Sequence, residues 1–185
     1  ECTNSKQILN LLKKHEEEPD IIAHHVWAIQ RLASLEEFKL CWQLFNELST
    51  TPKYLPLLTT HLYNTMISVS CQHHMSQSDR IRNDKLRQKK TCDKIFSLLS
   101  AMKSKANVQI NNDTVSTVIA SCAKLQQFGR GEGFWKSVQM DKEQTFKDVK
   151  LTIECYNSML DLYSKADAMN EAYDLYENIK LLDNV

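Results

Sequence analysis

A pattern of four positions occurs five times along the chain, and it restricts the fold more than any other feature. A small residue is followed by an apolar residue three positions on, an aromatic residue (leucine in the first copy) four on, and an apolar residue seven on. The copies are Ser5-Ile8-Leu9-Leu12, Cys41-Leu44-Phe45-Leu48, Cys92-Ile95-Phe96-Leu99, Gly131-Phe134-Trp135-Val138 and Ala172-Leu175-Tyr176-Ile179. Such spacing places all four side chains on one face of an α-helix. The small residue lets a partner helix approach closely, and the aromatic ring fills the seam between neighbours.

The last copy belongs to the clearest helical hairpin, from Cys155 to Lys180. A first helix with Met159 and Tyr163 on its apolar stripe precedes it, and a short turn around Ala166 separates the two helices. Each helix carries an apolar stripe that it cannot bury alone, so the hairpin requires a neighbour of the same kind. The repeated pattern supplies these neighbours and predicts a stack of hairpins.

Composition supports an all-α chain without catalytic or cofactor chemistry. Three glycines and three prolines in 185 residues are too few for a sandwich or barrel. The 23 basic and 23 acidic residues balance, so the overall charge favours neither nucleic acid nor an anionic membrane. No apolar run is long enough to span a bilayer. The six cysteines lack metal-ligand spacing and are expected as free thiols, and no residue set is spaced for catalysis. We therefore expect no enzyme, no cofactor, no metal and no membrane span.

We expect a single domain, 1–185, which is a piece of a longer repeat array. Its units are about 1–20 (partial), 21–57, 58–110, 111–151 and 152–185, and the third contains a basic insertion at 75–90. The cations of this insertion outnumber Asp79 and Asp84, and they are Arg80, Arg82, Lys85, Arg87, Lys89 and Lys90. A protruding basic loop could contact RNA phosphates, and Lys103 and Lys105 on a following loop would extend it. The alternative is a solvated, partly disordered turn.

At two places the sequence resembles pentatricopeptide repeats, whose first helix opens with an aromatic-Asn pair and whose second carries Ala-x-x-Leu-aromatic. The places are YNTMI from Tyr63 and YNSMLDLYSKADAMNEAYDLYENIK from Tyr156. The resemblance is strong over 155–180, good over 113–139, interrupted over 62–103 and weak over 21–48. It implies a right-handed α-solenoid and an organellar RNA-binding protein of the mitochondrial matrix, acting in transcript stability, processing or translation. The alternative is a scaffold, such as a small-subunit component of the mitochondrial ribosome that contacts proteins and ribosomal RNA.

The resemblance also implies how single-stranded RNA would be read along the concave face. In the family, one base-contacting side chain follows the aromatic of the first helix, and a second closes the repeat. Two pairs fit these places, Asn64 with Asn111 and Ser116 with Thr152. Two asparagines resemble pyrimidine-preferring repeats, whereas threonine departs from the usual Asp, Asn or Ser.

Two further residues at predicted base-contacting places, Asn157 and Thr59, lack a settled partner. The partner of Asn157 would lie beyond Val185, and Thr59 would close a unit whose first reader is either His25 or Val26. The alternative for Asn64 and Asn157 is a role as a helix cap or turn residue.

Overall fold

The computed structural model describes residues 4–15, 18, 20–105, 108–140, 146 and 149–182, so Cys2 lies outside the described residues. The helices in chain order are α1 (Ser5–Lys14), α2 (Ile21–Ser34), α3 (Phe38–Thr50), the short 3-10 helix η1 (Leu55–Leu57), α4 (Thr60–Met75), α5 (Asp79–Arg82), α6 (Lys85–Lys103), α7 (Asn112–Lys124), α8 (Phe128–Met140), α9 (Ile153–Lys165) and α10 (Met169–Leu182). None of these helices is long and apolar enough to cross a membrane.

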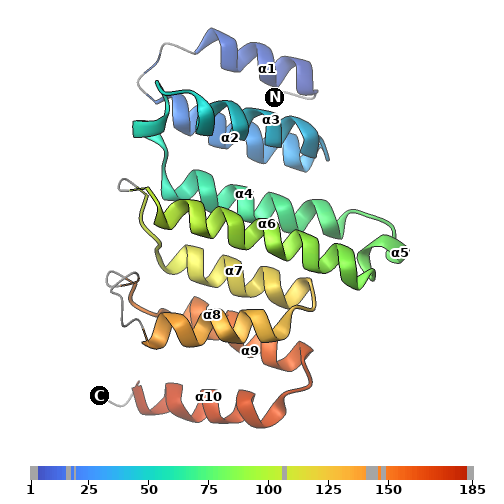
Figure 1. Ribbon diagram of the computed structural model, residues 1–185, viewed down its shortest axis with the longest axis vertical. Coiled ribbons are helices and arrows are strands. Elements are labelled where there is room, and N and C mark those ends of the chain that lie inside the picture. Colours follow the sequence, from blue (N-terminus) through green and yellow to red (C-terminus); the bar gives the residue numbers. More distant parts are fainter. Residues whose placement is uncertain are drawn as a thin grey trace.

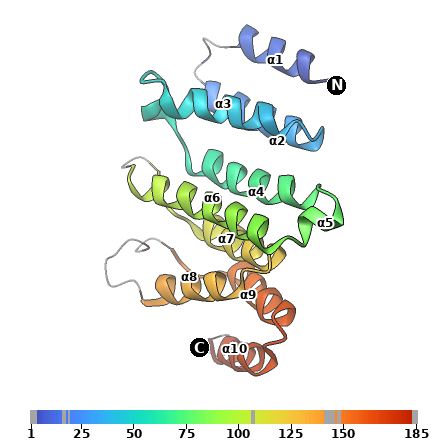
Figure 2. The ribbon, with the colours of Figure 1, turned by 45° about the vertical axis from the view of Figure 1, so that its right-hand side comes forward.

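The helices pair into hairpins that stack along the long axis of the molecule (Figure 1). The hairpins are α2–α3, α4–α6, α7–α8 and α9–α10, and α1 packs against α2 above them. The first helices form one layer, because α2 contacts α4, α4 contacts α7, and α7 contacts α9. In Figure 2 the second helices α6 and α8 lie on the opposite side of the stack from α4 and α9. The prediction of an all-α helical-repeat solenoid is confirmed.

The repeated four-residue pattern marks the seams of this stack. Phe45 of α3 meets Tyr63 of α4 edge to face at 5.4 Å between ring centroids, and Trp135 of α8 meets Tyr156 of α9 at 5.3 Å. In these two seams the aromatic residue of the second helix packs on the aromatic that opens the next first helix, whereas Phe96 of α6 meets Phe134 of α8 at 6.1 Å. At the small position, a Cβ on Gly131 would collide with the Leu162 side chain and lie 3.1 Å from the Cys122 Cβ. Close approach of α8 to α9 thus requires a small residue there.

Three of the four hairpin turns share one backbone conformation. Glu36, Gln126 and Asp167 each have a positive φ, between 54 and 60°. The amide of the next residue donates to a carbonyl five residues back, with N–O distances of 2.9 to 3.0 Å. This is the Schellman motif, in which a residue in the left-handed conformation ends the helix and the amide after it bonds to a carbonyl five residues back. The structural repeat is therefore visible in the turns as well as in the core.

The remaining hairpin, α4–α6, lacks this turn because the predicted insertion lies between its two helices. The sequence predicts a protruding basic loop or a solvated, partly disordered turn, but the segment continues α4 to Met75, forms α5 and begins α6 at Lys85. Asp84 caps α6 by accepting from the amides of Leu86 at 2.9 Å and Arg87 at 3.2 Å. Lys103 is the last residue of α6, so its predicted place on a loop is wrong.

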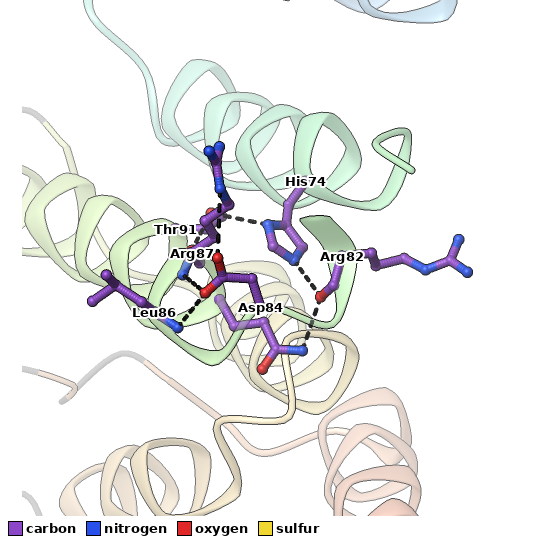
Figure 3. Close-up of polar contacts among 7 residues, drawn as sticks. His74, Arg82, Asp84, Leu86, Arg87 and Thr91 are labelled. Carbon is purple, nitrogen blue, oxygen red and sulfur yellow. Dashed lines mark hydrogen bonds and ion pairs between the residues drawn. The ribbon is translucent and has the colours of Figure 1, made fainter. Parts of the chain in front are cut away.

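A buried polar contact fastens the insertion to the hairpin. His74 Nε2 lies 3.0 Å from the Arg82 carbonyl oxygen, and the Gln88 amide donates to the same oxygen at 3.0 Å (Figure 3). His74 and Gln88 are both buried. Because an unpaired buried polar group is costly, these bonds favour one position of α5 against α4 and α6. The first half of α6 is consequently held in a defined orientation.

Candidate nucleic-acid interface

A hollow of about 500 Å³ opens on the layer of first helices, between α2, α4 and α7. We call it the first-helix hollow. Its side chains are mostly polar and neutral, with Asp113 as the acidic exception, and they include Gln30, Ser34, His61, Asn64, Thr65, Ser68, Gln72, Asp113 and Thr117. An adjoining hollow continues along α4 and α7 to Lys124. The layer therefore offers a polar path across two neighbouring hairpins.

The predicted base-contacting residues occupy equivalent places in their helices. Asn64, Ser116 and Asn157 are each the fifth residue of α4, α7 and α9, so none of them is a helix cap. Two of the closing residues, Asn111 and Thr152, are the N-caps of α7 and α9. The sequence left open a role as helix cap for Asn64 and Asn157, but the N-cap positions belong to Asn111 and Thr152.

Thr59, the third closing residue, is the N-cap of α4, and its side chain accepts from the Leu62 amide at 3.2 Å. The unit that Thr59 would close contains no matching reader in the hollow. Val26 is buried, and the buried His25 ring lies 2.8 Å from the Ile21 carbonyl oxygen. Neither open alternative lines the first-helix hollow, where α2 contributes Gln30 and Ser34.

The structure brings Asn64 and Asn111 together across the α4–α7 contact. Asn64 Nδ2 donates to Asn111 Oδ1 at 3.3 Å, although the two residues are 47 positions apart. Thr114 completes the group, because its hydroxyl donates to Asn64 Oδ1 at 2.8 Å and its backbone amide donates to Asn111 Oδ1 at 2.9 Å. We call Asn64, Asn111 and Thr114 the amide cluster.

The amide cluster has donors to spare and few free acceptors. Asn111 Oδ1 already accepts from two N–H groups, and Asn64 Oδ1 accepts from Thr114. Each side-chain amide nitrogen carries two hydrogens. Asn111 is exposed, whereas Asn64 is 8% exposed. Asn111 Nδ2 donates one hydrogen to Asp113 Oδ2 at 3.4 Å. The cluster can therefore donate to carbonyl oxygens of a base, chiefly through the second hydrogen of the Asn111 amide.

The other predicted readers are less closely associated. Ser116 is half-buried and its hydroxyl donates to the Asp113 carbonyl at 3.2 Å. Thr152 lies beside Cys155, with 3.7 Å between Oγ1 and Sγ. Among the hydrogen bonds of the described side chains, none joins Ser116 to Thr152. Asn157 is exposed on α9.

The predicted phosphate-contacting residues lie elsewhere. Arg80 and Arg82 are on α5, and Lys85, Arg87, Lys89 and Lys90 are on α6. Arg82 forms an ion pair with Asp79. Arg87 Nε lies 3.7 Å from Asp84 Oδ2 (Figure 3). None of these six cations lines the first-helix hollow. Arg87 and Lys90 instead line a hollow beside α3, so the structure does not bring the cations and the asparagines to one site.

Comparison with known proteins supports the pentatricopeptide resemblance at the last hairpin. The family model of the PPR repeat matches residues 154–183, which comprise most of α9 and α10. No curated protein shows significant similarity to the chain. The resemblance drawn from the sequence is confirmed for this hairpin, and a PPR repeat is typical of RNA-binding helical-repeat proteins.

Proposed function

We propose that this PPR-repeat chain binds single-stranded RNA along its layer of first helices, with one base against the amide cluster. The observation that carries the proposal is the contact between Asn64 and Asn111. These residues belong to consecutive hairpins, and they meet at the edge of the polar first-helix hollow. Such repeat proteins read each base with two or three side chains, and here the second side chain is the residue that closes the repeat, at the start of the next hairpin.

The hydrogen-bonding state of the cluster favours a base with a carbonyl oxygen. Asn111 Oδ1 is occupied by Asn64 and Thr114, Asn64 Oδ1 is occupied by Thr114, and one Asn111 amide hydrogen is directed to Asp113, so the remaining amide hydrogens are the groups left to meet a base. Uracil, cytosine and guanine present carbonyl oxygens and adenine does not, and the resemblance to pyrimidine-preferring repeats favours uracil or cytosine among them. Because Asp113 lines the hollow, we place the phosphates away from it, toward Lys124 in the adjoining hollow. Ser116, Thr152 and Asn157 would extend the same path toward α9.

The biological setting follows from the family resemblance. We propose an organellar protein of the mitochondrial matrix that acts in transcript stability, processing or translation. In that role the chain needs no chemistry of its own, since occupying an RNA segment is sufficient to protect or expose it. RNA is the proposed principal partner, within an assembly that also includes other proteins.

The experiment is a binding measurement with the full chain and two labelled oligonucleotides, oligouridylate and oligoadenylate. Asn111→Asp keeps a good N-cap but replaces the amide donors with a carboxylate. We expect it to lower affinity for oligouridylate by about tenfold, the effect of one well-formed base contact. Asn64→Ala should likewise reduce the preference for uridine.

Asn46→Ala is the matched control, because Asn46 is an exposed asparagine on the second helix α3. It should bind both oligonucleotides like the natural chain. If folded Asn111→Asp and Asn64→Ala proteins retained the natural preference, the amide cluster would not read the base.

One observation favours a second function, that of a ribonucleoprotein scaffold. The insertion's cations do not line the first-helix hollow, and two of them face the second helices instead. A component of the small subunit of the mitochondrial ribosome could contact proteins with its first helices and ribosomal RNA with its basic residues. RNA binding that ignored base identity and survived both asparagine variants would support this alternative.

A further inference from the structure

A second hollow, of about 250 Å³, lies between α3, the end of α4 and the first half of α6. We call it the second-helix hollow. Its lining combines cations, an indole ring and neutral polar groups, and includes Trp42, His73, Gln77, Arg87, Lys90 and Lys94. None of the described residues that line this hollow carries a carboxylate. It therefore differs in charge from the first-helix hollow.

The three cations form a row along one side of α6. Arg87, Lys90 and Lys94 are separated by three and four positions, which places them on the same helical face. The row extends over about 10 Å, at 1.5 Å of helix per residue. Arg87 is partly neutralised by Asp84, which leaves Lys90 and Lys94 as the principal charges. A row of this length suits an extended chain of negative charges better than a single compact anion.

Aromatic groups lie directly beside this row. Lys94 Nζ is 5.5 Å from the centroid of the Trp42 ring, across the gap between α3 and α6. The rings of Phe38 and His73 stack at 4.6 Å next to them. Burial and the nearby Lys94 lower the pKa of His73, so the ring is neutral at pH 7 and adds a stacking surface rather than charge. Cations next to aromatic faces are the arrangement that holds single-stranded nucleic acid without regard to sequence.

The surrounding helices keep the row in place. The bonds from His74 and Gln88 to the Arg82 carbonyl, together with the Asp84 cap, fix the start of α6 (Figure 3). A neighbouring hollow, which also contains Trp42 and Lys94, carries Glu36 and Glu37. These carboxylates repel a polyanion on the α3 side, so a bound polyanion should run along α6.

We infer that the second-helix hollow is a second RNA site, which holds the phosphate backbone through Lys90, Lys94 and Arg87 beside Trp42. The inference rests on the proposed function only in taking RNA as the ligand, because none of these four residues lines the first-helix hollow. An RNA that passes from one face of the stack to the other, or a folded RNA gripped on both, would contact both sites.

The test uses the full chain, oligouridylate and oligoadenylate, and two double variants of equal charge. K90Q/K94Q removes two cations from the hollow. K85Q/K89Q removes two exposed lysines from the same helix that do not line it. The sequence predicts phosphate contacts for Lys85 and Lys89 as well, and we now infer none for them. Two lost phosphate contacts reduce the slope of log affinity against log salt by about 1.4, which corresponds to about a sevenfold change in the ratio of natural to variant affinity between about 50 and 200 mM NaCl.

The expected result is that K90Q/K94Q weakens binding of both oligonucleotides alike and lowers the salt slope, whereas K85Q/K89Q leaves the slope unchanged. Asn64→Ala, which changes no charge, should alter the uridine preference and not the slope, so each of the two sites is tested independently of the other. If the two double variants weakened RNA binding equally, binding would depend on the total charge of α6 and not on the hollow, and the inference would be overturned. Natural affinity in K90Q/K94Q, or displacement of RNA by polyglutamate at equal charge concentration, would overturn it as well.

Discussion

Replacement of Gly131 by alanine tests the seam between α8 and α9, on which the repeat interpretation depends. Gly131 occupies the small position of the repeated pattern, and an added Cβ would collide with Leu162 and lie 3.1 Å from the Cys122 Cβ. Gly133 is in the same helix, and a Cβ there would meet nothing within 4 Å. The pair separates the effect of helix propensity from the effect of crowding.

The expected magnitudes follow from these surroundings. Alanine in place of an interior helical glycine stabilises a helix by about 1 kcal/mol, so Gly133→Ala should raise the free energy of unfolding by about that amount. Gly131→Ala gains the same propensity but must displace Leu162, and overfilling a well-packed site costs about 1–3 kcal/mol. The free energy of unfolding of Gly131→Ala should therefore lie about 1–3 kcal/mol below that of Gly133→Ala.

Urea and thermal unfolding followed by circular dichroism measure this difference. For a chain of this length each 1 kcal/mol shifts the melting temperature by about 2–4 °C, so the two variants should melt several degrees apart. If Gly131→Ala were as stable as Gly133→Ala, the small position would not set the approach of neighbouring helices. The account of the seam would then be refuted.

Three other predictions concern single groups. Asn111→Ala should lower the free energy of unfolding by about 1–2 kcal/mol in urea melts through loss of the α7 cap, while Asn111→Asp should be close to neutral. His74→Ala should speed hydrogen exchange across 78–90 without affecting α1, because it removes one of two bonds to the Arg82 carbonyl; unchanged exchange would show that the insertion is held otherwise. Burial raises the pKa of the Cys41 thiol to about 11. Since the thiolate is the nucleophile, its alkylation at pH 8 should be about 100-fold slower than that of an unfolded cysteine, as read by mass spectrometry.

The stack of hairpins was predictable because the residues that pack between neighbouring hairpins recur at a fixed spacing in the sequence. A small residue and an aromatic four positions later are readable within one helix turn, and Gly131 and Trp135 occupy these places in the structure. The approach of Asn111 to Asn64 was also predictable, since the resemblance makes Asn64 the first base-contacting residue of a repeat and Asn111 the residue that closes the same repeat. What the spacing did not give was their hydrogen-bonding state, which Thr114 determines.

The insertion was harder to predict because long-range polar contacts order it. The sequence identified Asp84 only as a negative charge of the insertion, and its role as the cap of α6 came from the structure. The bonds of His74 and Gln88 to one carbonyl depend on the fold around them. The second-helix hollow was missed for a related reason. Trp42 and Lys94 belong to different hairpins, and only the stacking of α3 beside α6 brings them together.

The central claim is that RNA lies on the layer of first helices, and photo-cross-linking tests it most directly. Oligouridylate containing 4-thiouridine would be cross-linked to the full chain, and the modified peptides would be identified by mass spectrometry. We predict cross-links in α4 and α7, around Asn64 and Asn111, that weaken in the Asn111→Asp protein at an RNA concentration below its dissociation constant. Cross-links confined to α3, α6 and α8, with none in α4 or α7, would contradict the claim.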